Sequence, residues 1–426
     1  MKMVKRSKKQ DERNVNDPFR NLPNDLNVEI LMKLPPKSIV RLRFASKHLS
    51  SIILEKEFTK LYMTRSSTQP RHLISVLRGG SNMQMQRFHS FSQDHPSDSN
   101  LDEVSYKLDP NLPYVFTPSV RGLICGRDGT KMIVGNPSTG QFVSLPTVES
   151  RRQDILSAFG YDPVNDVYKV LCMKVVTKPS NMSRGGGGGD IVAWEDIMSE
   201  EHQVITLGAK QEWRMVECKY PHRPYSGYQE ICRDGVMYYL ASYKQKRSLM
   251  SFNLSSEDFN VIKLPEDKML QQFGFLTNHT GKITIVSQAY SITIDLWVLE
   301  DANKEVWSKA AVVFPPVAVY GRLHRVFFAF RGILGTGEMI FSPYTFAPRT
   351  TPNPFLFIGY DPKSKKVGET VMNGIGDEYD TIQVFFDHVE KVLKNIKKHI
   401  NVILILAVLN QPHNKTLGGI DLLTYI

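Results

Sequence analysis

The chain has 426 residues, 41% of them apolar, and carries 53 Lys or Arg against 43 Asp or Glu, a formal net charge of +10. This length and apolar content exclude a wholly disordered chain and predict a globular protein of two or three domains. Residues 1–72 contain 16 Lys or Arg and 7 Asp or Glu, whereas the other 354 residues contain 37 and 36, so the basic charge is local and does not by itself indicate nucleic-acid binding.

Residues 1–20 are polar and basic, and we expect them to form a disordered leader. The first helix then begins with Asn24 or Asp25 as its cap. Apolar residues at every fourth position predict that this helix buries one face, which carries Leu26, Ile30 and Leu34. The Pro35-Pro36 pair ends the helix, because proline lacks an amide hydrogen and disfavours a helical conformation in the residue before it.

A second helix is expected from about Lys37 or Ser38, and Ser46 is placed to cap a third. The apolar face of the third helix carries Leu49, Ile52 and Ile53. A unit of about 45 residues buries little apolar surface by itself. We therefore expect these three helices, residues 21–66, to complete their core on another protein.

This stretch closely resembles an F-box. The matching positions are Leu22, Pro23, Asp25, Leu26, Glu29, Ile30, Leu31, Leu34, Pro35, Ser38, Arg41 and Lys47. The resemblance implies that the helices dock on a Skp-type adaptor, which links substrate receptors to a cullin ubiquitin ligase. The adaptors of this family are acidic, which suits the basic charge of this region.

The resemblance also implies which residues bind the adaptor. They are Leu22, Pro23, Leu26, Glu29, Ile30, Leu31, Leu34, Pro35, Ser38, Arg41, Leu42, Lys47 and Leu49. Leu49 departs from the family, which usually has tryptophan at this position, so an aliphatic side chain replaces a large aromatic anchor. We therefore expect weaker adaptor binding than is usual for the family, and a relic F-box that no longer assembles is an alternative.

From Arg71 onward the helical spacing of apolar residues ends, and short segments typical of β-strands follow, separated by Gly, Pro, Asn and Asp. The equivalent glycines Gly235, Gly281 and Gly332 lie 46 and 51 residues apart. Units of about 40 to 50 residues with three or four strands favour propeller blades over a pair of β-sandwiches. We predict a β-propeller-like domain over residues 71–380, interrupted by a Gly-rich insertion at 178–190, and leave the number of blades open.

This second region is similar to plant F-box-associated domains, which resemble kelch-type propellers. The segments that carry the similarity are 121–123, 160–163, 168–170, 213–214, 234–240 and 273–274. With the N-terminal helices, the resemblance implies an α+β multidomain receptor of a cullin-type (SCF) ubiquitin ligase. Its β domain would recruit an unknown target protein for ubiquitination.

The end of the chain shows helical spacing of apolar residues. They are Ile382, Phe385, Phe386, Val389, Val392, Leu393, Ile396 and Ile400. We predict an amphipathic helix over residues 381–400 that covers an open edge of the propeller, and the alternative is a helix for a membrane surface or a partner. Residues 401–426 form a tail without a family counterpart.

No catalytic or metal-binding motif accompanies these elements. Asp162, Asp234 and Asp361 stand beside Gly or Pro, which favours a role in turns over acid-base chemistry. We therefore predict no catalytic residue, no cofactor and no metal, and a non-enzymatic protein that binds neither nucleic acid nor a membrane. The alternative is a kelch-like sugar-binding or oxidase-like protein.

Substrate contacts are expected in loops that combine aromatic residues with Arg or His. The candidates are His222, Arg223, Tyr225, Arg322, His324 and Tyr344.

The four cysteines are far apart in the sequence, and the longest apolar run, residues 402–409, is much shorter than the about 20 residues that span a membrane. Without a secretory leader, we expect reduced thiols and an intracellular protein, in the nucleus and/or the cytoplasm. The basic run at residues 5–9 is a candidate nuclear signal.

Overall fold

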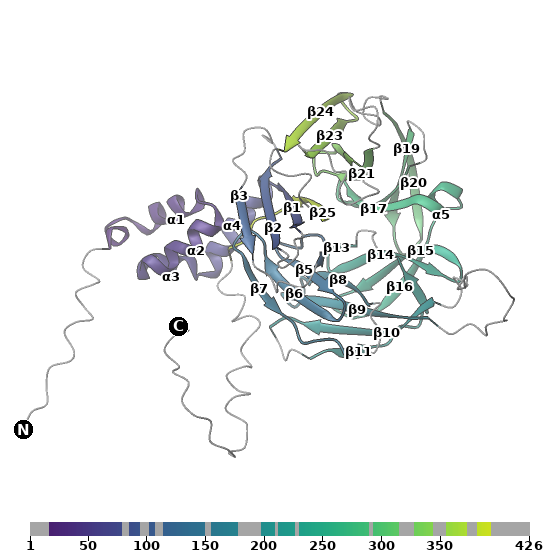
Figure 1. Ribbon diagram of the computed structural model, residues 1–426, viewed down its shortest axis with the longest axis horizontal. Helices are drawn as coiled ribbons and strands as arrows, with labels where there is room; N and C mark the ends of the chain where they lie inside the picture. Colours follow the sequence, from purple (N-terminus) through teal and green to yellow (C-terminus); the bar gives the residue numbers. More distant parts are fainter. Residues whose placement is uncertain are drawn as a thin grey trace, which may run out of the picture.

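The computed structural model describes residues 17–78, 85–93, 102–106, 114–149, 155–177, 197–208, 212–225, 230–288, 293–314, 328–343, 355–372 and 381–392. A small group of helices lies beside a ring of β-sheets (Figure 1). The Gly-rich insertion predicted at 178–190 and the predicted tail at 401–426 lie outside the described residues. No helix in the described ranges is both long and apolar enough to cross a membrane.

The N-terminal helices follow the sequence pattern with two corrections. They are the 3-10 helix η2 (Pro18–Asn21) and the α-helices α1 (Asn24–Met32), α2 (Pro36–Ala45), α3 (Lys47–Ile53) and α4 (Lys56–Thr68). Ser46 caps α3 as predicted, since its hydroxyl accepts a hydrogen bond from the backbone N–H of Leu49 at 3.0 Å. The predicted cap at Asn24 or Asp25 is wrong because Pro23 occupies that position without a side-chain hydrogen bond.

The second correction is a fourth α-helix, which begins after an extended residue at Glu55. The turn before α4 lets its aromatic residues fold back onto the same core as α3. That core contains Leu31, Ile39, Leu49, Ile52, Ile53, Phe58, Tyr62 and Val392. The helices therefore bury more of their own surface than three helices would.

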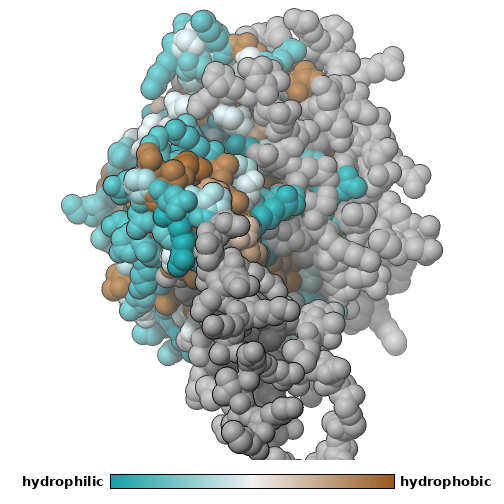
Figure 2. All heavy atoms as spheres, turned by 90° about the vertical axis from the view of Figure 1, so that its left-hand side faces the viewer, coloured by the Kyte–Doolittle hydropathy of each residue, from teal (hydrophilic) through white to brown (hydrophobic). Residues whose placement is uncertain are grey.

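Helix α1 presents a different face to this core from the one we predicted. It buries Asn27 and Leu31, whereas Leu26 and Ile30 are 46% and 41% exposed. The side-chain amide of Asn27 donates to the backbone oxygens of Phe19 at 2.8 Å and Leu22 at 3.3 Å, which ties α1 to the segment before it and sets its rotation. Figure 2 views the molecule from the side of the helices, and in its coloured part brown apolar spheres gather among teal ones.

The β region is a propeller, as predicted, and among the described residues it has six blades. Its strands form five antiparallel sheets, and the nine-stranded sheet holds two blades joined by β12 (His222–Pro224). The first complete blade contains β4 (Val115–Phe116), β5 (Ile124–Asp128), β6 (Lys131–Asn136) and β7 (Gln141–Ser144). The two joined blades contain β8 (Ile155–Asp162), β9 (Val167–Thr177), β10 (Ile197–Thr206) and β11 (Arg214–Val216), then β13 (Ile231–Arg233), β14 (Val236–Tyr243), β15 (Lys246–Asn253) and β16 (Phe259–Lys263).

The next two blades follow in chain order, the first preceded by a short helix, α5 (Lys268–Phe273). Their strands are β17 (Gly274–His279), β18 (Lys282–Gln288), β19 (Thr293–Asp301) and β20 (Val306–Val313), then β21 (Phe328–Ile333), β22 (Met339–Pro343), β23 (Phe355–Asp361) and β24 (Lys366–Met372). The sixth blade combines the two ends of the domain. It contains β25 (Thr381–His388), β1 (Arg71–Arg78), β2 (Met85–Ser92) and β3 (Asp102–Tyr106).

Strand β25 overturns the amphipathic helix predicted from residue 381. It pairs antiparallel with β1, with Leu73 opposite Phe385 and Ile74 opposite Val384. Both faces of the strand are apolar, because Val384 packs in one core cluster and Phe385 in another. A strand buried on both faces loses the alternation that distinguishes it from a helix, which explains the wrong prediction. Residues 393–400 of the predicted helix lie outside the described part of the chain.

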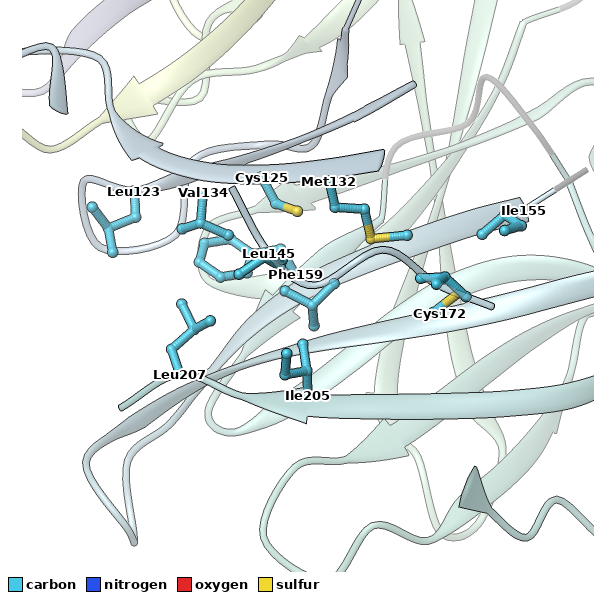
Figure 3. Packing of buried hydrophobic residues seen from close by; sticks show 12 residues of the cluster. Leu123, Cys125, Met132, Val134, Leu145, Ile155, Phe159, Cys172, Ile205 and Leu207 are labelled. Atoms are coloured by element: carbon cyan, nitrogen blue, oxygen red, sulfur yellow. The ribbon is translucent and has the colours of Figure 1, made fainter. Parts of the chain in front are cut away.

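Neighbouring blades pack through apolar clusters. One cluster joins the blade of β4–β7 to that of β8–β11 and includes Leu123, Cys125, Phe159, Cys172 and Ile205 (Figure 3). All four cysteines are free, and burial raises the pKa of the Cys172 thiol to about 12. These interfaces are continuous around the ring, so each small sheet buries its faces against its neighbours.

Candidate functional site

The helices carry a concentrated set of exposed apolar side chains. Four of the ten large apolar residues exposed in the described ranges lie on them: Leu26 at 46%, Ile30 at 41%, Phe44 at 79% and Leu61 at 52%. When a partner covers such a side chain, the free energy falls by about 25 cal/mol for each Å² of apolar surface removed from water. Exposed apolar side chains on one small domain make its surface the candidate docking surface for another protein.

The charges around these side chains are mainly positive. Residues 24–68 contain eight Lys or Arg and four Asp or Glu. Lys33 pairs with Glu29 at 2.8 Å and lowers the pKa of that carboxyl, while Arg41 and Lys47 are exposed. The surface therefore suits a partner with an acidic, partly apolar face.

The structure divides the predicted adaptor-binding residues by burial. Pro23, Leu26, Glu29, Ile30, Pro35, Arg41 and Lys47 are exposed, and Leu22, Leu34, Ser38 and Leu42 are half-buried. Leu31 and Leu49 are only 1% exposed and belong to the core of the helices. The position where the family usually has tryptophan is thus an interior position in this chain.

Phe44 is a surface residue that the sequence reasoning missed. It is the most exposed large apolar residue of the described chain at 79%, and the Arg43 guanidinium lies 5.6 Å from the centre of its ring. A phenylalanine next to arginine near the end of a predicted helix was the available signal. It adds an aromatic candidate anchor to the docking surface.

The segment after β25 fastens the helices to the propeller. The backbone N–H of Glu390 donates to the hydroxyl of Ser66 on α4 at 2.7 Å, and the Glu390 carboxylate lies 3.5 Å from the Arg71 guanidinium. Val392 is 1% exposed inside the helical core, while the side-chain amide of Asn136 on β6 donates to the carbonyl of Lys391 at 2.6 Å. One short segment therefore holds both parts of the molecule.

His388, at the end of β25, anchors this segment in the propeller. Its ring is fully buried and makes hydrogen bonds to Ser119 at 2.8 Å and Ser138 at 3.0 Å. Burial, together with the positive charge of Arg71, lowers its pKa to about 3. The imidazole is consequently neutral at physiological pH.

A cavity of about 840 Å³ lies between α4 and the propeller. Lys391 lines it and donates to the Tyr168 hydroxyl at 2.8 Å. Burial, and then the nearby charge of Arg121, lowers the pKa of Lys391 to about 8. This cavity lies where the segment after β25 joins the helices to the propeller.

The predicted substrate-binding residues differ in how far they are exposed to solvent. His222 is fully buried, so it is not a surface contact, and that prediction is wrong for the structure shown here. Its side chain turns inward from β12 because Tyr239 offers it a hydrogen bond at 2.9 Å. Arg223 and Tyr225 are half-buried, and the Arg247 guanidinium lies 4.9 Å from the Tyr225 ring. Arg322, His324 and Tyr344 lie outside the described residues.

Two of the carboxylates considered for catalysis have structural roles. Asp162 accepts hydrogen bonds from the backbone of Val164 at 2.9 Å and Asn165 at 3.3 Å. Asp361 accepts from the backbone of Lys363 at 2.9 Å. Both carboxylates therefore stabilise turns between strands, as the sequence indicated.

Comparisons with known proteins agree with this two-part architecture. A family model described as an F-box domain matches residues 19–61, and one described as an F-box associated beta propeller domain matches residues 72–389. An F-box/kelch-repeat protein of Arabidopsis thaliana is 56% identical over 91% of this chain and 97% of its own length. Two F-box proteins of the same plant are 33% and 32% identical, over 87% and 84% of this chain and 91% and 87% of their own lengths. The chain therefore belongs to the family of F-box proteins with an F-box-associated β-propeller domain.

Proposed function

We propose that this protein is the substrate-recognition subunit of a cullin-type (SCF) ubiquitin ligase. The observation that carries the proposal is the exposure of Leu26 and Ile30 on α1, within a basic helical domain that lacks a cover for them among the described residues. A Skp-type adaptor with an acidic and apolar face would complete that surface. The cullin would then be reached through the adaptor.

The propeller has the role of holding the target protein in this proposal. The contacts around Ser66 and Glu390 attach it to the helices, so a target on the ring would have a defined position relative to the adaptor. Proximity and orientation of a target lysine are what such a receptor contributes. The covalent transfer of ubiquitin belongs to the partners, and the chain itself acts without a catalytic residue or cofactor.

The cellular place of the complex is part of the same proposal. Cys125 and Cys172 are buried as free thiols, which suits a reducing compartment. We place the protein in the nucleus and/or the cytoplasm. The kelch-like character of its propeller also stays a prediction.

Binding to a purified Skp-type adaptor tests the proposal. Two apolar anchors, each contributing roughly 1.5 kcal/mol, make the Leu26→Glu, Ile30→Glu double variant at least about 100-fold weaker than the unmodified chain. The matched control is Val164→Glu with Val371→Glu, which charges two exposed valines, 77% and 48% exposed, on the propeller. This control retains full affinity.

Two results would overturn the proposal. Full adaptor binding by the Leu26, Ile30 double variant would show that α1 is not the docking helix. Absence of adaptor binding by the unmodified, folded chain would favour the relic F-box, or a sugar-binding or oxidase-like protein.

A further inference from the structure

Three side chains able to bind a metal meet inside the nine-stranded sheet. They are His202 on β10, Cys218 after β11 and His222 on β12, and their ligand atoms all lie within 4.8 Å of one another. The sulfur of Cys218 lies 3.9 Å from Nδ1 of His222. Cys218 and His222 are four residues apart, a spacing similar to that of ligand pairs in structural zinc sites, whereas His202 lies 16 residues before the cysteine and joins them through the pairing of β10.

We propose that these three residues form a binding site for a divalent transition metal, zinc in the first place. Thiolate and imidazole are the ligands that zinc prefers, at about 2.3 Å and 2.0 Å, and a tetrahedral ion would hold sulfur and nitrogen roughly 3.5 Å apart. The Cys218 to His222 separation is within a few tenths of an ångström of that value. Three protein ligands leave a fourth position for water or for a backbone oxygen.

The surroundings of His222 favour coordination through Nδ1. Its other nitrogen, Nε2, lies 2.9 Å from the Tyr239 hydroxyl, and Tyr239 is 5% exposed. A metal-bound histidine generally needs a hydrogen-bond partner for its second nitrogen, which fixes the orientation of the ring. Tyr239 is placed to be that partner.

The proton balance of binding follows from these contacts. Without metal, Nδ1 of His222 carries the proton and donates to the carbonyl of Tyr220 at 2.7 Å, while Nε2 accepts from Tyr239. With metal on Nδ1, the imidazole proton resides on Nε2 and is donated to the Tyr239 oxygen. The Cys218 thiol loses its proton to solvent, so binding releases one proton.

Two of the three ligand residues are buried and the third, Cys218, is half-buried. His202 and His222 are 3% and 0% exposed, and the Phe259 ring lies 4.8 Å from that of His202. Protein atoms enclose both imidazoles, so the two rings are held in place beside the Cys218 sulfur.

A metal here would stabilise the junction of two blades. β12 joins β10 to β14. It pairs with β10 at one position, Ser199 with His222, and with β14 at three positions. An ion shared by β10 and β12 would hold the short connection between Cys218 and His222 in place. This role does not depend on the adaptor proposal.

Cobalt titration of the full purified chain tests the site. We expect one equivalent of Co²⁺ to produce thiolate-to-cobalt charge-transfer absorption and the visible bands of a tetrahedral ion, and Zn²⁺ to displace it. Cys218→Ser abolishes the charge-transfer band and lowers the affinity at least about tenfold. The matched control is Cys232→Ser, which removes the other half-buried cysteine and leaves the spectrum unchanged.

A second measurement uses the unmodified protein and does not depend on the folding of a variant. Zn²⁺ slows alkylation of Cys218 by iodoacetamide, followed by peptide mass spectrometry, and leaves the rate at Cys232 unchanged. The proposal is overturned if the chain shows no thiolate-to-cobalt band, or if Zn²⁺ protects both cysteines equally or neither.

Discussion

The backbone N–H of Glu390 donates to the hydroxyl of Ser66 at 2.7 Å, although 324 residues separate them in the chain. The contact joins α4, the last helix of the F-box, to the segment that leaves the last strand of the propeller. Two residues further on, Val392 enters the core of the helices. The end of the propeller domain is thus a structural part of the F-box.

Val392→Ala tests this shared core. Removing two methyl groups from a side chain that is 1% exposed should lower the free energy of unfolding of the helical part by roughly 1 to 2 kcal/mol. Hydrogen exchange resolves the effect, because amides of α1 to α4 exchange faster while those of the central blades do not. Val371→Ala, at a side chain that is 48% exposed on β24, is the control. Equal exchange in the two variants would show that Val392 does not stabilise the helices.

Leu49→Trp is expected to lower the folding stability of the protein. Leu49 is 1% exposed among residues of the helical core, so a larger ring overpacks the site and costs about 1 to 3 kcal/mol of folding free energy. Urea unfolding measures the loss, and adaptor affinity measured in parallel should not increase. A gain in affinity at unchanged stability would instead place this side chain on the docking surface.

Removal of β25 should abolish cooperative folding of the propeller. A chain that ends at residue 380 leaves β1 without its neighbour and exposes the apolar residues that face Phe385 and Val384. Thermal unfolding monitored by circular dichroism, with dye binding to exposed apolar surface, reports the change. A chain that ends at residue 400 keeps β25 and Val392 and serves as the control. A sharp transition at the control's melting temperature in the shorter chain would contradict ring closure by β25.

Because of His388, the free energy of unfolding should decrease as the pH is lowered. Its pKa is lowered to about 3 by burial in the folded protein, whereas a histidine in the unfolded chain has a pKa near 6.5. Between these values the unfolded state binds more protons, so stability falls as the pH drops from about 6.5, by about 2 kcal/mol at pH 5 from this residue. Urea midpoints at pH 7 and pH 5 measure the loss.

The contribution of His388 is isolated by His388→Gln, which keeps hydrogen-bonding groups near Ser119 and Ser138 but does not titrate in this range. In this variant, the difference in unfolding free energy between pH 7 and pH 5 is smaller by about 2 kcal/mol. Parallel pH profiles of the two proteins would show that His388 does not contribute.

Local chemistry determined much of the architecture before any tertiary contact was considered. The Pro35-Pro36 pair separates α1 from α2, and the Ser46 hydroxyl caps α3. The aspartates at Asp162 and Asp361 bond nearby backbone amides, so the turns between strands were readable as well. These features depend on residues that are neighbours in the chain, and they were predicted correctly.

Features that depend on distant residues were predicted poorly. The rotation of α1, which exposes Leu26 and buries Leu31, follows from the core that Leu31 shares with Val392, a residue at the other end of the described chain. The residues of β25 have apolar neighbours on both faces, and only pairing with β1 identifies them as a strand.

Local sequence patterns thus identify an F-box followed by repeated small sheets, because caps, proline breaks and turns act over a few residues. Contacts in the folded protein establish how the ring closes, how Val392 joins it to the helices, and that His202, Cys218 and His222 meet. Ring closure and the place of Val392 arise from pairing and burial between segments far apart in the chain, whereas the three metal-binding side chains come from neighbouring segments that the pairing of β12 with β10 brings together.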